Sequence, residues 1–345
     1  MTNPDLQLSA YDYHLPPHLI AQTPAERREK SRLLVYKRQQ ESITHKIFDV
    51  LHEELNPGDV LVVNNSKVFP ARIFGEKSHT GTRFEFLLLR EETPGCWEAL
   101  AKNSKRIKPG YVFRFAEGVE AEIKESRAAG HVLLEFKPMP DFWQWIHTHG
   151  EIPYPPYIQS REAGDARYQT VFEGPTGSVA APTAGLHFSE SYTEFLKQRG
   201  ILFAEVTLHV GIGTFMPVRT DNITDHPMHK EFYVLPEATA ALLNRQRAAG
   251  HRIISVGTTA TRTLESVYRK YGEYRAESDS TRLFLYPGQP IQSIDALITN
   301  FHLPQSSLLM LVSAFIGREP MMRIYEEAIA EAYRFYSFGD AMLLL

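Results

Sequence analysis

The sequence predicts a mixed α/β protein, with a largely parallel sheet, open or barrel-like, in its core domain and a small antiparallel β domain inserted into it. From residue 178 to residue 300, short apolar strands alternate with amphipathic helices, which is typical of parallel sheets. Between residues 67 and 137, short runs of alternating polarity follow one another instead, as in a β sandwich or barrel. The length of 345 residues suits two domains. We therefore assign residues 1–66 and 150–345 to a discontinuous α/β domain, and residues 67–149 to the insert.

The composition is that of an ordinary globular protein, with 43% hydrophobic and 23% charged residues. A formal net charge of -4 argues against a uniformly basic nucleic-acid coat but allows a local basic face. The single cysteine, Cys96, permits no intramolecular disulfide, which suits a reducing cytoplasm. The N-terminus lacks the features of a signal peptide, and no apolar run reaches the ~18 residues of a membrane span. We expect a cytoplasmic protein without a membrane partner.

The N-terminal part predicts short elements in quick succession. The segment PPHLIA begins with prolines that the first turn of a helix tolerates. SRLLVYKR reads as a strand, and FDVLHEEL as a helix that stops at Asn56-Pro57-Gly58. GDVLVVNN then predicts a buried strand rich in β-branched residues.

The insert is predicted to be basic as well as β-rich. Residues 67–137 hold 13 Lys and Arg against 10 Asp and Glu, so they carry +3 and the rest of the chain -7. Four of these cations lie in AKNSKRIKPG (101–110), which is either a solvated loop or a contact for phosphates. A short helix over 141–150 and an irregular, proline-stiffened return over 152–158 complete this region. The predicted strands are RIFGEK, TRFEFLLLR, CWEALAK, YVFRFAEG, EAEIKES and HVLLEFK.

The C-terminal half predicts the main sheet. Helices are expected over 189–200, where Ser191 and Glu194 fit a capping box, and over 236–250, 258–272, 305–316 and 320–335. The helix over 258–272 should bury one face that holds Leu264, Val267, Tyr268 and Tyr271. The predicted strands are SVAA (178–181), ILFAEVTLHVG (201–211), EFYVL (231–235), HRIISVG (251–257), RLFLYPG (282–288) and SIDALITN (293–300).

Polar residues collect where four of these strands end. Because ligands bind beyond the carboxyl ends of the strands in such sheets, we expect these loops to converge on one cleft. The candidate binding residues of these loops are Thr183, Gly185, Gly211, Gly213, Thr214, Gly257, Thr258, Thr259, Arg262, Asn300 and His302.

One of these loops, Gly257-Thr258-Thr259, opens a helix. Free N–H groups at a helix N-terminus, together with two hydroxyls, suit a carboxylate or a phosphate. The alternative is that a threonine only caps the helix. The GxxxxGK[ST] pattern of a P-loop is absent, and Gly211-x-Gly213 alone is weak evidence for a nucleotide.

Five titratable residues form the candidate catalytic set: His187, His209, His226, His229 and Glu231. A metal site is one interpretation, but HExxH is absent and Pro227 disfavours a regular helix across the histidine pair. Acid/base work or ligand hydrogen bonding is favoured, and no metal is expected. Packed or surface histidines are the remaining alternative.

Further candidates lie outside these loops. Asn65, Lys67 and Arg72 adjoin the insert, where polar residues often line a cleft, although they could merely cap a strand. Asp340 follows a glycine near the C-terminus, where an aspartate in a turn is the plain interpretation.

Along nearly its whole length the chain resembles the S-adenosylmethionine:tRNA ribosyltransferase-isomerase family of queuosine biosynthesis. Departures are few: Ala260 and Thr261 stand where the family usually has serine and valine, and Ser307 where it has threonine. The strings that carry the resemblance are YDYHLPPHLIAQTP, SRLL, NPGDVLVVNNSKVFPARIFG, IPYPPYI, RYQTVF, GSVAAPTAGLHF, VTLHVGIGTFMPV, HPMHKE, VGTTATRTLES, DALITNFHLPQSSLLMLVSAF and YRFYSFGDAML.

The resemblance implies an α/β domain that carries an inserted β-barrel. It implies transfer and isomerisation of the ribosyl moiety of S-adenosylmethionine onto 7-aminomethyl-7-deazaguanine at the tRNA wobble position, which gives epoxyqueuosine-tRNA and releases adenine and methionine. The expected partners are S-adenosylmethionine and the anticodon stem-loop of queuosine-family tRNAs, with no cofactor beyond that co-substrate. We expect a monomer. Two other classes stay open: a metal-dependent hydrolase built on the histidine cluster, and a non-catalytic RNA-binding module.

Overall fold

The structure is a computed structural model, and it describes residues 3–160, 162, 164–172, 174–211, 213 and 218–345. The chain divides into two compact units. The α/β unit comprises residues 1–67, 156–175 and 181–345, and the barrel unit comprises residues 68–155 and 176–180. The chain thus leaves the first unit and returns to it.

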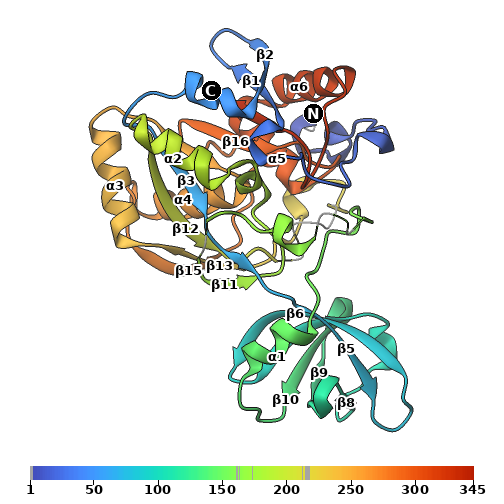
Figure 1. Cartoon of the computed structure of the whole chain (residues 1–345). Helices are drawn as coiled ribbons and strands as arrows, with labels where there is room; N and C mark the ends of the chain where they lie inside the picture. Colours follow the sequence, from blue (N-terminus) through green and yellow to red (C-terminus); the bar gives the residue numbers. More distant parts are fainter. Residues whose placement is uncertain (1–2, 161, 163, 173, 212, 214–217) are drawn as a thin grey trace. The chain divides into compact units, whose positions relative to one another are not determined.

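The α/β unit is built on an open mixed sheet of nine strands (Figure 1). Its four central neighbours, β12, β3, β14 and β16, are all parallel to one another. The outer pairings are antiparallel, except that β17 and β1 run parallel. The strand order is β15 (Glu277–Thr281), β13 (Glu231–Leu235), β12 (Leu202–Leu208), β3 (Val60–Asn64), β14 (Ile253–Val256), β16 (Ala296–Asn300), β17 (Ala341–Leu344), β1 (Arg32–Lys37) and β2 (Ser42–Ile47).

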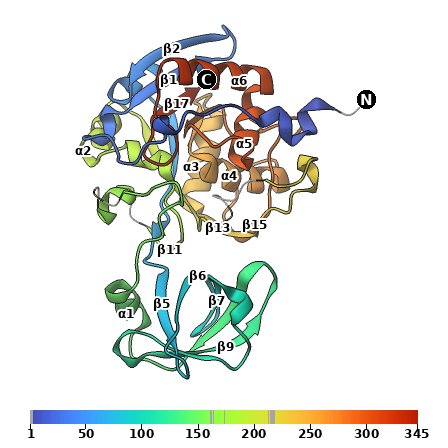
Figure 2. The same cartoon turned by 90° about the vertical axis from the view of Figure 1, so that its right-hand side faces the viewer.

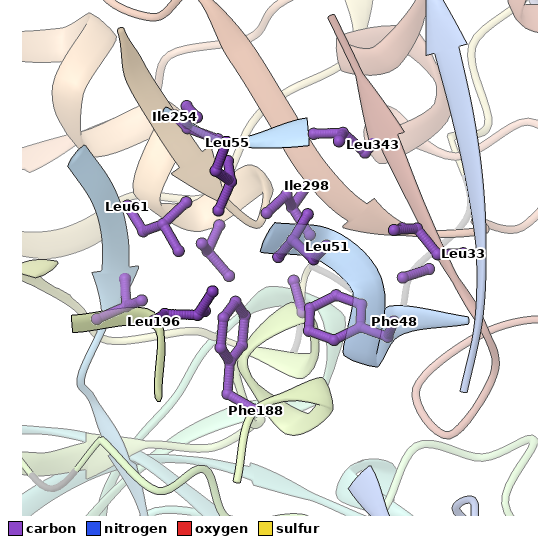
Figure 3. Packing of buried hydrophobic residues seen from close by; sticks show 14 of the residues in the cluster. Leu33, Phe48, Leu51, Leu55, Leu61, Phe188, Leu196, Ile254, Ile298 and Leu343 are labelled. Carbon is purple, nitrogen blue, oxygen red and sulfur yellow. The ribbon is translucent and has the colours of Figure 1, made fainter. Parts of the chain in front are cut away.

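A hydrophobic cluster covers one face of this sheet (Figure 3). Alternate strand residues such as Leu61 and Val63 belong to it, because successive side chains point to opposite faces. Phe48 and Leu51 of the 3₁₀ helix η5 (Phe48–Glu54) and Phe188 meet them there. All five residues of β3 are buried, so both faces of the sheet are covered at its centre.

Helices flank the sheet, and their ends follow local signals. Ser189 caps α2 (Glu190–Gln198), so the predicted cap at Ser191 is wrong by two residues. In α4 (Thr258–Tyr271) Leu264 and Val267 are buried as predicted, but Tyr271, the last residue of the helix, is 43% exposed, so its predicted burial is wrong. The other helices of this unit are α3 (Glu237–Ala248), α5 (Ser307–Ile316) and α6 (Arg318–Ala330).

The barrel unit contains a closed antiparallel barrel, so the inserted β domain is a barrel and not a sandwich (Figure 2). Phe86, Phe113 and Ile123 are fully buried in it, and Phe142 of α1 (Phe142–His149) stacks on Trp97. The six strands are β5 (Arg72–Lys77), β6 (Arg83–Thr93), β7 (Cys96–Ala101), β8 (Val112–Arg114), β9 (Glu120–Ser126) and β10 (His131–Phe136), one for each predicted run.

Four predicted elements differ in the structure. Only a single 3₁₀ turn forms at Pro17–Leu19, and η5 is a 3₁₀ helix rather than an α-helix. The segment 282–288 contains no strand, and its carbonyl at Leu283 accepts a hydrogen bond from the Arg262 side chain. The segment 178–181 is no strand of the main sheet: Thr176–Ser178 forms the short β11, which pairs with β4 (Lys67–Val68).

Candidate active site at the carboxyl edge of the sheet

The strand directions bring most of the predicted site residues to one edge of the nine-stranded sheet. The parallel strands β12, β3, β14 and β16 all end at this edge. Glu231 begins β13 at the same edge, because β13 runs antiparallel to β12. Asp340, which precedes β17, lies there too, because β17 runs antiparallel to β16. The edge is hollowed at more than one place.

The first hollow, here called the Arg262 hollow, lies beside the N-terminal half of α4. Its polar lining includes His226, His229, Glu231 and Arg262, and Gly213 adds backbone. An added Cβ at Gly213 would lie 2.3 Å from Cδ2 of His229, so this glycine permits the close approach of the ring. The apolar lining consists of Met228, Leu283, Phe284, Leu285, Leu308 and Leu311.

Glu231 and Arg262 form a buried ion pair in this hollow, with about 6% of each residue exposed. The second carboxylate oxygen of Glu231 accepts the amide of Gly211 at 2.8 Å. Nε of Arg262 donates a hydrogen bond to the carbonyl of Leu283, while its buried Nη2 has no hydrogen-bond partner among the described residues. Glu231 is thus paired with Arg262, and the Nη2 amino group of the guanidinium remains for a ligand.

His226 and His229 are more accessible than the ion pair. His226 is half-buried against Phe284, and His229 is exposed. Burial lowers the pKa of His226, and the nearby charge of His229 lowers it further. A histidine in this state is neutral near pH 7 and suits a proton acceptor.

The second hollow, here called the Asn300 hollow, adjoins the first, since Leu308 lines both. Tyr157, Phe301 and Tyr336 give it aromatic walls, and the Tyr157 and Tyr336 rings lie 4.6 Å apart between centroids. Thr183, Asn300 and His302 of the predicted set are in its lining.

His187 is buried beneath the edge, where it lines a small separate hollow with Arg28 and Ser31, and it is not a free base. Its Nδ1 lies 2.8 Å from Oγ of Ser31 and its Nε2 lies 3.1 Å from Nδ2 of Asn300, and its ring stacks on Phe48. Burial, reinforced by the charge of Arg334, lowers its pKa to about 3. The ring is therefore neutral at pH 7, with both nitrogens engaged.

His302 is held in the same way. Its ring nitrogens contact Thr299 Oγ1 at 3.2 Å and Tyr325 Oη at 3.3 Å, and burial lowers its pKa to about 3. The pKa of His209 is also lowered by burial, but His209 is half-buried, and its Nδ1 lies 2.8 Å from Ser66 Oγ. Its other ring nitrogen contacts no described residue within hydrogen-bond distance, so His209 keeps one site for a ligand.

Asn64 and Ser66, which flank the candidate residue Asn65, hold neighbouring strand ends together. Asn64 Oδ1 accepts the amides of Ser66 and Leu208, and its Nδ2 donates to Leu208 O and to Thr259 Oγ1. All four hydrogen-bonding positions of this amide are used. The signal was in the sequence: two asparagines end a buried apolar strand, where a polar side chain needs partners.

At the start of α4, Gly257 has φ +93°, and an added Cβ would lie 3.3 Å from Cβ of Ala184. Thr258 and Thr259 follow it and are both buried. Gly185 lies in the buried 3₁₀ helix η10 (Thr183–His187), where an added Cβ would meet Thr170 at 2.9 Å. Both glycines therefore allow close packing at the edge.

Some predicted binding residues make structural contacts instead of lining these hollows. Asn65 Nδ2 donates to Glu205, and Asn65 Oδ1 accepts from Thr207. The Asp340 carboxylate accepts the amides of Arg32 and Arg334. Thr214 lies outside the described residues.

The remaining predicted residues are cations. Lys67, in the α/β unit, is exposed. Arg72 belongs to the barrel unit and lies 3.4 Å from Glu85. The basic loop 102–108 of the barrel unit exposes Lys102, Lys105, Arg106 and Lys108, and no ion pair links the last three to any residue that the structure describes.

Neither a metal-ligand cluster nor a membrane-spanning helix is found in the described part of the chain. No three His, Cys, Asp or Glu side chains among those residues gather as ligands would. No helix there is both long and apolar enough to cross a membrane.

Hollows lined by titratable groups at the carboxyl ends of parallel strands define a ligand-binding α/β protein. Comparison with known proteins defines it further, because the family model described as "Queuosine biosynthesis protein" matches residues 8–344. The chain belongs to this family of queuosine biosynthesis proteins.

Two relatives are similar over their full length. The S-adenosylmethionine:tRNA ribosyltransferase-isomerase of Staphylococcus saprophyticus is 48% identical over 341 residues, which cover 99% of this chain and 100% of that protein. The crystal structure of S-adenosylmethionine tRNA ribosyltransferase from Thermotoga maritima is 39% identical and covers 97% of this chain and 100% of its own, with a TM-score of 0.57.

Proposed function

We propose that this chain is a transferase that moves the ribosyl moiety of S-adenosylmethionine onto 7-aminomethyl-7-deazaguanine at the tRNA wobble position and isomerises it. The product is epoxyqueuosine-tRNA, and adenine and methionine are released. One observation carries this proposal: 48% identity to a ribosyltransferase-isomerase across essentially the whole of both chains. The match covers the edge loops as well as the barrel unit.

The Arg262 hollow supports a binding role for the methionine carboxylate. Arg262 is already neutralised by Glu231, so its free Nη2 adds a directed donor without adding net charge. A buried donor without a partner costs about 1–3 kcal/mol, which a bound carboxylate oxygen would relieve. The neighbouring Thr258 and Thr259 at the start of α4 extend this anion-binding proposal.

The reaction needs a base for the C5′ proton beside the sulfonium and an acid for the departing adenine. His226 and His229 line the Arg262 hollow, and His209 keeps one ring nitrogen for a ligand. We assign the proton transfers to these three histidines. His187 and Glu231, which the sequence placed in the catalytic set, are proposed as positioning residues, since their polar atoms are engaged by the protein.

The basic loop 102–108 and the cations Lys67 and Arg72 are proposed to face the tRNA backbone. Lys105, Arg106 and Lys108 are exposed and unpaired among the described residues, which suits phosphate contacts. In this proposal residues 67–149 serve as the tRNA-facing insert, and residues 1–66 and 150–345 as the catalytic domain. S-adenosylmethionine is the co-substrate, no further cofactor is expected, and the protein acts as a cytoplasmic monomer.

The deciding experiment incubates the protein with S-adenosylmethionine and tRNA that carries the aminomethyl base. We expect adenine release in step with a nucleoside mass that corresponds to the epoxyqueuosine product. The same tRNA with guanine at the wobble position is the control and should release no adenine. Absence of adenine release from the aminomethyl tRNA would overturn the enzyme assignment.

A further inference from the structure

Asn300 carries a buried acceptor with no partner. The residue is 2% exposed, and its Nδ2 contacts His187 Nε2 at 3.1 Å and the carbonyl of Tyr336 at 3.1 Å. Because a carbonyl oxygen only accepts, the atom that faces Tyr336 is the amide nitrogen. The other atom, Oδ1, contacts no donor among the described residues.

The neighbours of Asn300 hold this orientation. His187 Nε2 accepts from Asn300, so the proton of the neutral ring lies on Nδ1 and is donated to Ser31 Oγ. Ser31 Oγ in turn donates to the carbonyl of Arg28 at 3.3 Å. Each donor in this row of hydrogen bonds, from Asn300 through His187 and Ser31, has an acceptor. At its end, only Oδ1 of Asn300 lacks a partner among the described residues.

The surroundings of Asn300 indicate the kind of ligand that would supply the missing donor. Asn300 lines a hollow with the aromatic side chains of Tyr157, Phe301 and Tyr336. Such walls favour a flat ring, and a single fixed acceptor favours a ring that carries an amino group. A carboxylate or a phosphate has no donor to offer to Oδ1.

We propose that the Oδ1 atom of Asn300 accepts a hydrogen bond from the exocyclic amino group of an aminopurine or amino-7-deazapurine seated in the Asn300 hollow. This inference rests on the proposed function, whose two substrates both carry such a group. We assign this amino group to the adenine of S-adenosylmethionine, because the Asn300 hollow adjoins the Arg262 hollow, with which it shares Leu308. One elongated ligand then places its amino-substituted ring at Asn300 and its carboxylate at Arg262.

The test removes the amino group from the ligand while the protein stays unchanged. One arm uses an S-adenosylmethionine analogue with hydrogen in place of the 6-amino group, and the other uses tRNA whose deazapurine lacks the 2-amino group. Formation of the modified nucleoside gives kcat/KM, and equilibrium dialysis of labelled S-adenosylmethionine and its analogue gives Kd without turnover. In the wild type we expect the 6-amino deletion to weaken Kd and kcat/KM about tenfold, the value of one hydrogen bond.

Two variants separate recognition from structural support. In Asn300→Ala the amino-bearing and amino-free ligands should become equivalent, because the acceptor that distinguishes them is gone. In Ser31→Ala, which alters the far end of the same hydrogen-bonded chain but keeps Oδ1, the tenfold preference should remain. If Asn300→Ala does not fold, equal behaviour of the amino-bearing and amino-free ligands in the wild type still overturns the proposal.

Each outcome has one meaning. A preference that appears only with the tRNA arm supports the acceptor and assigns it to the deazapurine. Equal behaviour of both ligand pairs in the wild type overturns the proposal, as does a preference that persists in Asn300→Ala. If the wild type binds S-adenosylmethionine with the expected preference but makes no product, the proposed function fails while the acceptor stands.

Discussion

At the scale of single residues, the Glu231–Arg262 pair decides how the Arg262 hollow is charged. Both groups are buried, and Glu231 also holds the amide of Gly211. Removal of one partner of a buried pair leaves an uncompensated charge, which usually costs more than removal of both. The two charges of the pair therefore compensate each other, and Nη2 of Arg262 remains available to a ligand.

We predict that Arg262→Met lowers the free energy of unfolding by about 3–5 kcal/mol, because Glu231 then stays buried without its cation. The double variant Glu231→Gln with Arg262→Met should recover part of that loss. Urea unfolding of the wild type, the two single variants and the double variant measures the coupling. Strictly additive losses would contradict the buried-pair description.

His226 provides a second residue-scale prediction, because the charge of His229 helps to lower its pKa. Replacement of His229 by Gln removes that like charge, so the pKa of His226 should rise. The acid limb of its NMR titration then moves to higher pH. The control is Lys230→Gln, which removes an exposed neighbouring cation that does not contribute to this shift. The same movement in the control would show that the effect is general charge and not the histidine pair.

The sequence predicted which strand ends converge at one edge of the sheet, but it did not predict what each side chain contacts there. The strand ends converge because strand direction follows from alternating strands and helices. The roles of His187 and His302 could not be predicted, because a histidine in a sequence gives no sign of how deeply it is buried. Packing against Phe48 and contacts from Asn300 and Ser31 come from distant parts of the chain.

At the scale of elements, polar edge strands escaped prediction and apolar loops were mistaken for strands. β15 reads ESDST and β2 reads SITHKI, and both lie at sheet edges where no buried face imposes an apolar alternation. The apolar segment 283–285 lines the Arg262 hollow instead of joining the sheet. The periodicity of apolar residues in a sequence indicates which residues are buried. It does not distinguish residues that line a hollow from residues of a buried strand.

The basic loop 102–108 gives the element-scale prediction. Charge reversal at Lys105 and Arg106 should weaken tRNA binding and reduce the slope of log K against log salt by about 1–2, since each lost phosphate contact removes close to one unit. The control is Lys137→Glu, an exposed cation of the same unit that is paired with Glu120. Binding isotherms at several salt concentrations give the slopes. Unchanged affinity and slope after charge reversal would remove the loop from the tRNA surface, and Kd for S-adenosylmethionine should not change in any variant.

At the scale of the whole molecule, we expect the two units to differ in how their stability responds to acid. His187 and His302 are both in the α/β unit, and burial lowers the pKa of each to about 3. His209 and His226, whose pKa values are also lowered by burial, belong to the same unit. In the barrel unit, hydrogen bonds from Arg127 lower the pKa of the Glu92 carboxyl, and at Glu98 burial is outweighed by hydrogen bonds from Arg90 and His131, which lower its pKa.

The sign follows from which state binds more protons. A histidine in the unfolded chain has a pKa near 6.5. Below that pH the unfolded α/β unit binds protons that the buried histidines of the folded unit do not bind, so the free energy of unfolding falls. For His187 and His302 together the loss between pH 6.5 and pH 5 is about 3 kcal/mol. Carboxyls with lowered pKa values lose their contribution to the free energy of unfolding only below about pH 4.5. We therefore expect the barrel unit to stay folded between pH 6.5 and pH 5.

The chain offers a direct readout of this difference, because its three tryptophans, Trp97, Trp143 and Trp145, all lie in the barrel unit. On titration from pH 7 to pH 5 in moderate urea, we expect the far-ultraviolet helix signal to decay before tryptophan fluorescence changes. His302→Gln should flatten the pH dependence of the helix signal, because it removes one of the two deeply buried imidazoles. Replacement of the exposed His18 by Gln should leave that dependence unchanged. Coincident decay of both signals in the wild type would mean that the two units unfold as one, and acid sensitivity could not then be assigned to the buried histidines of the α/β unit alone.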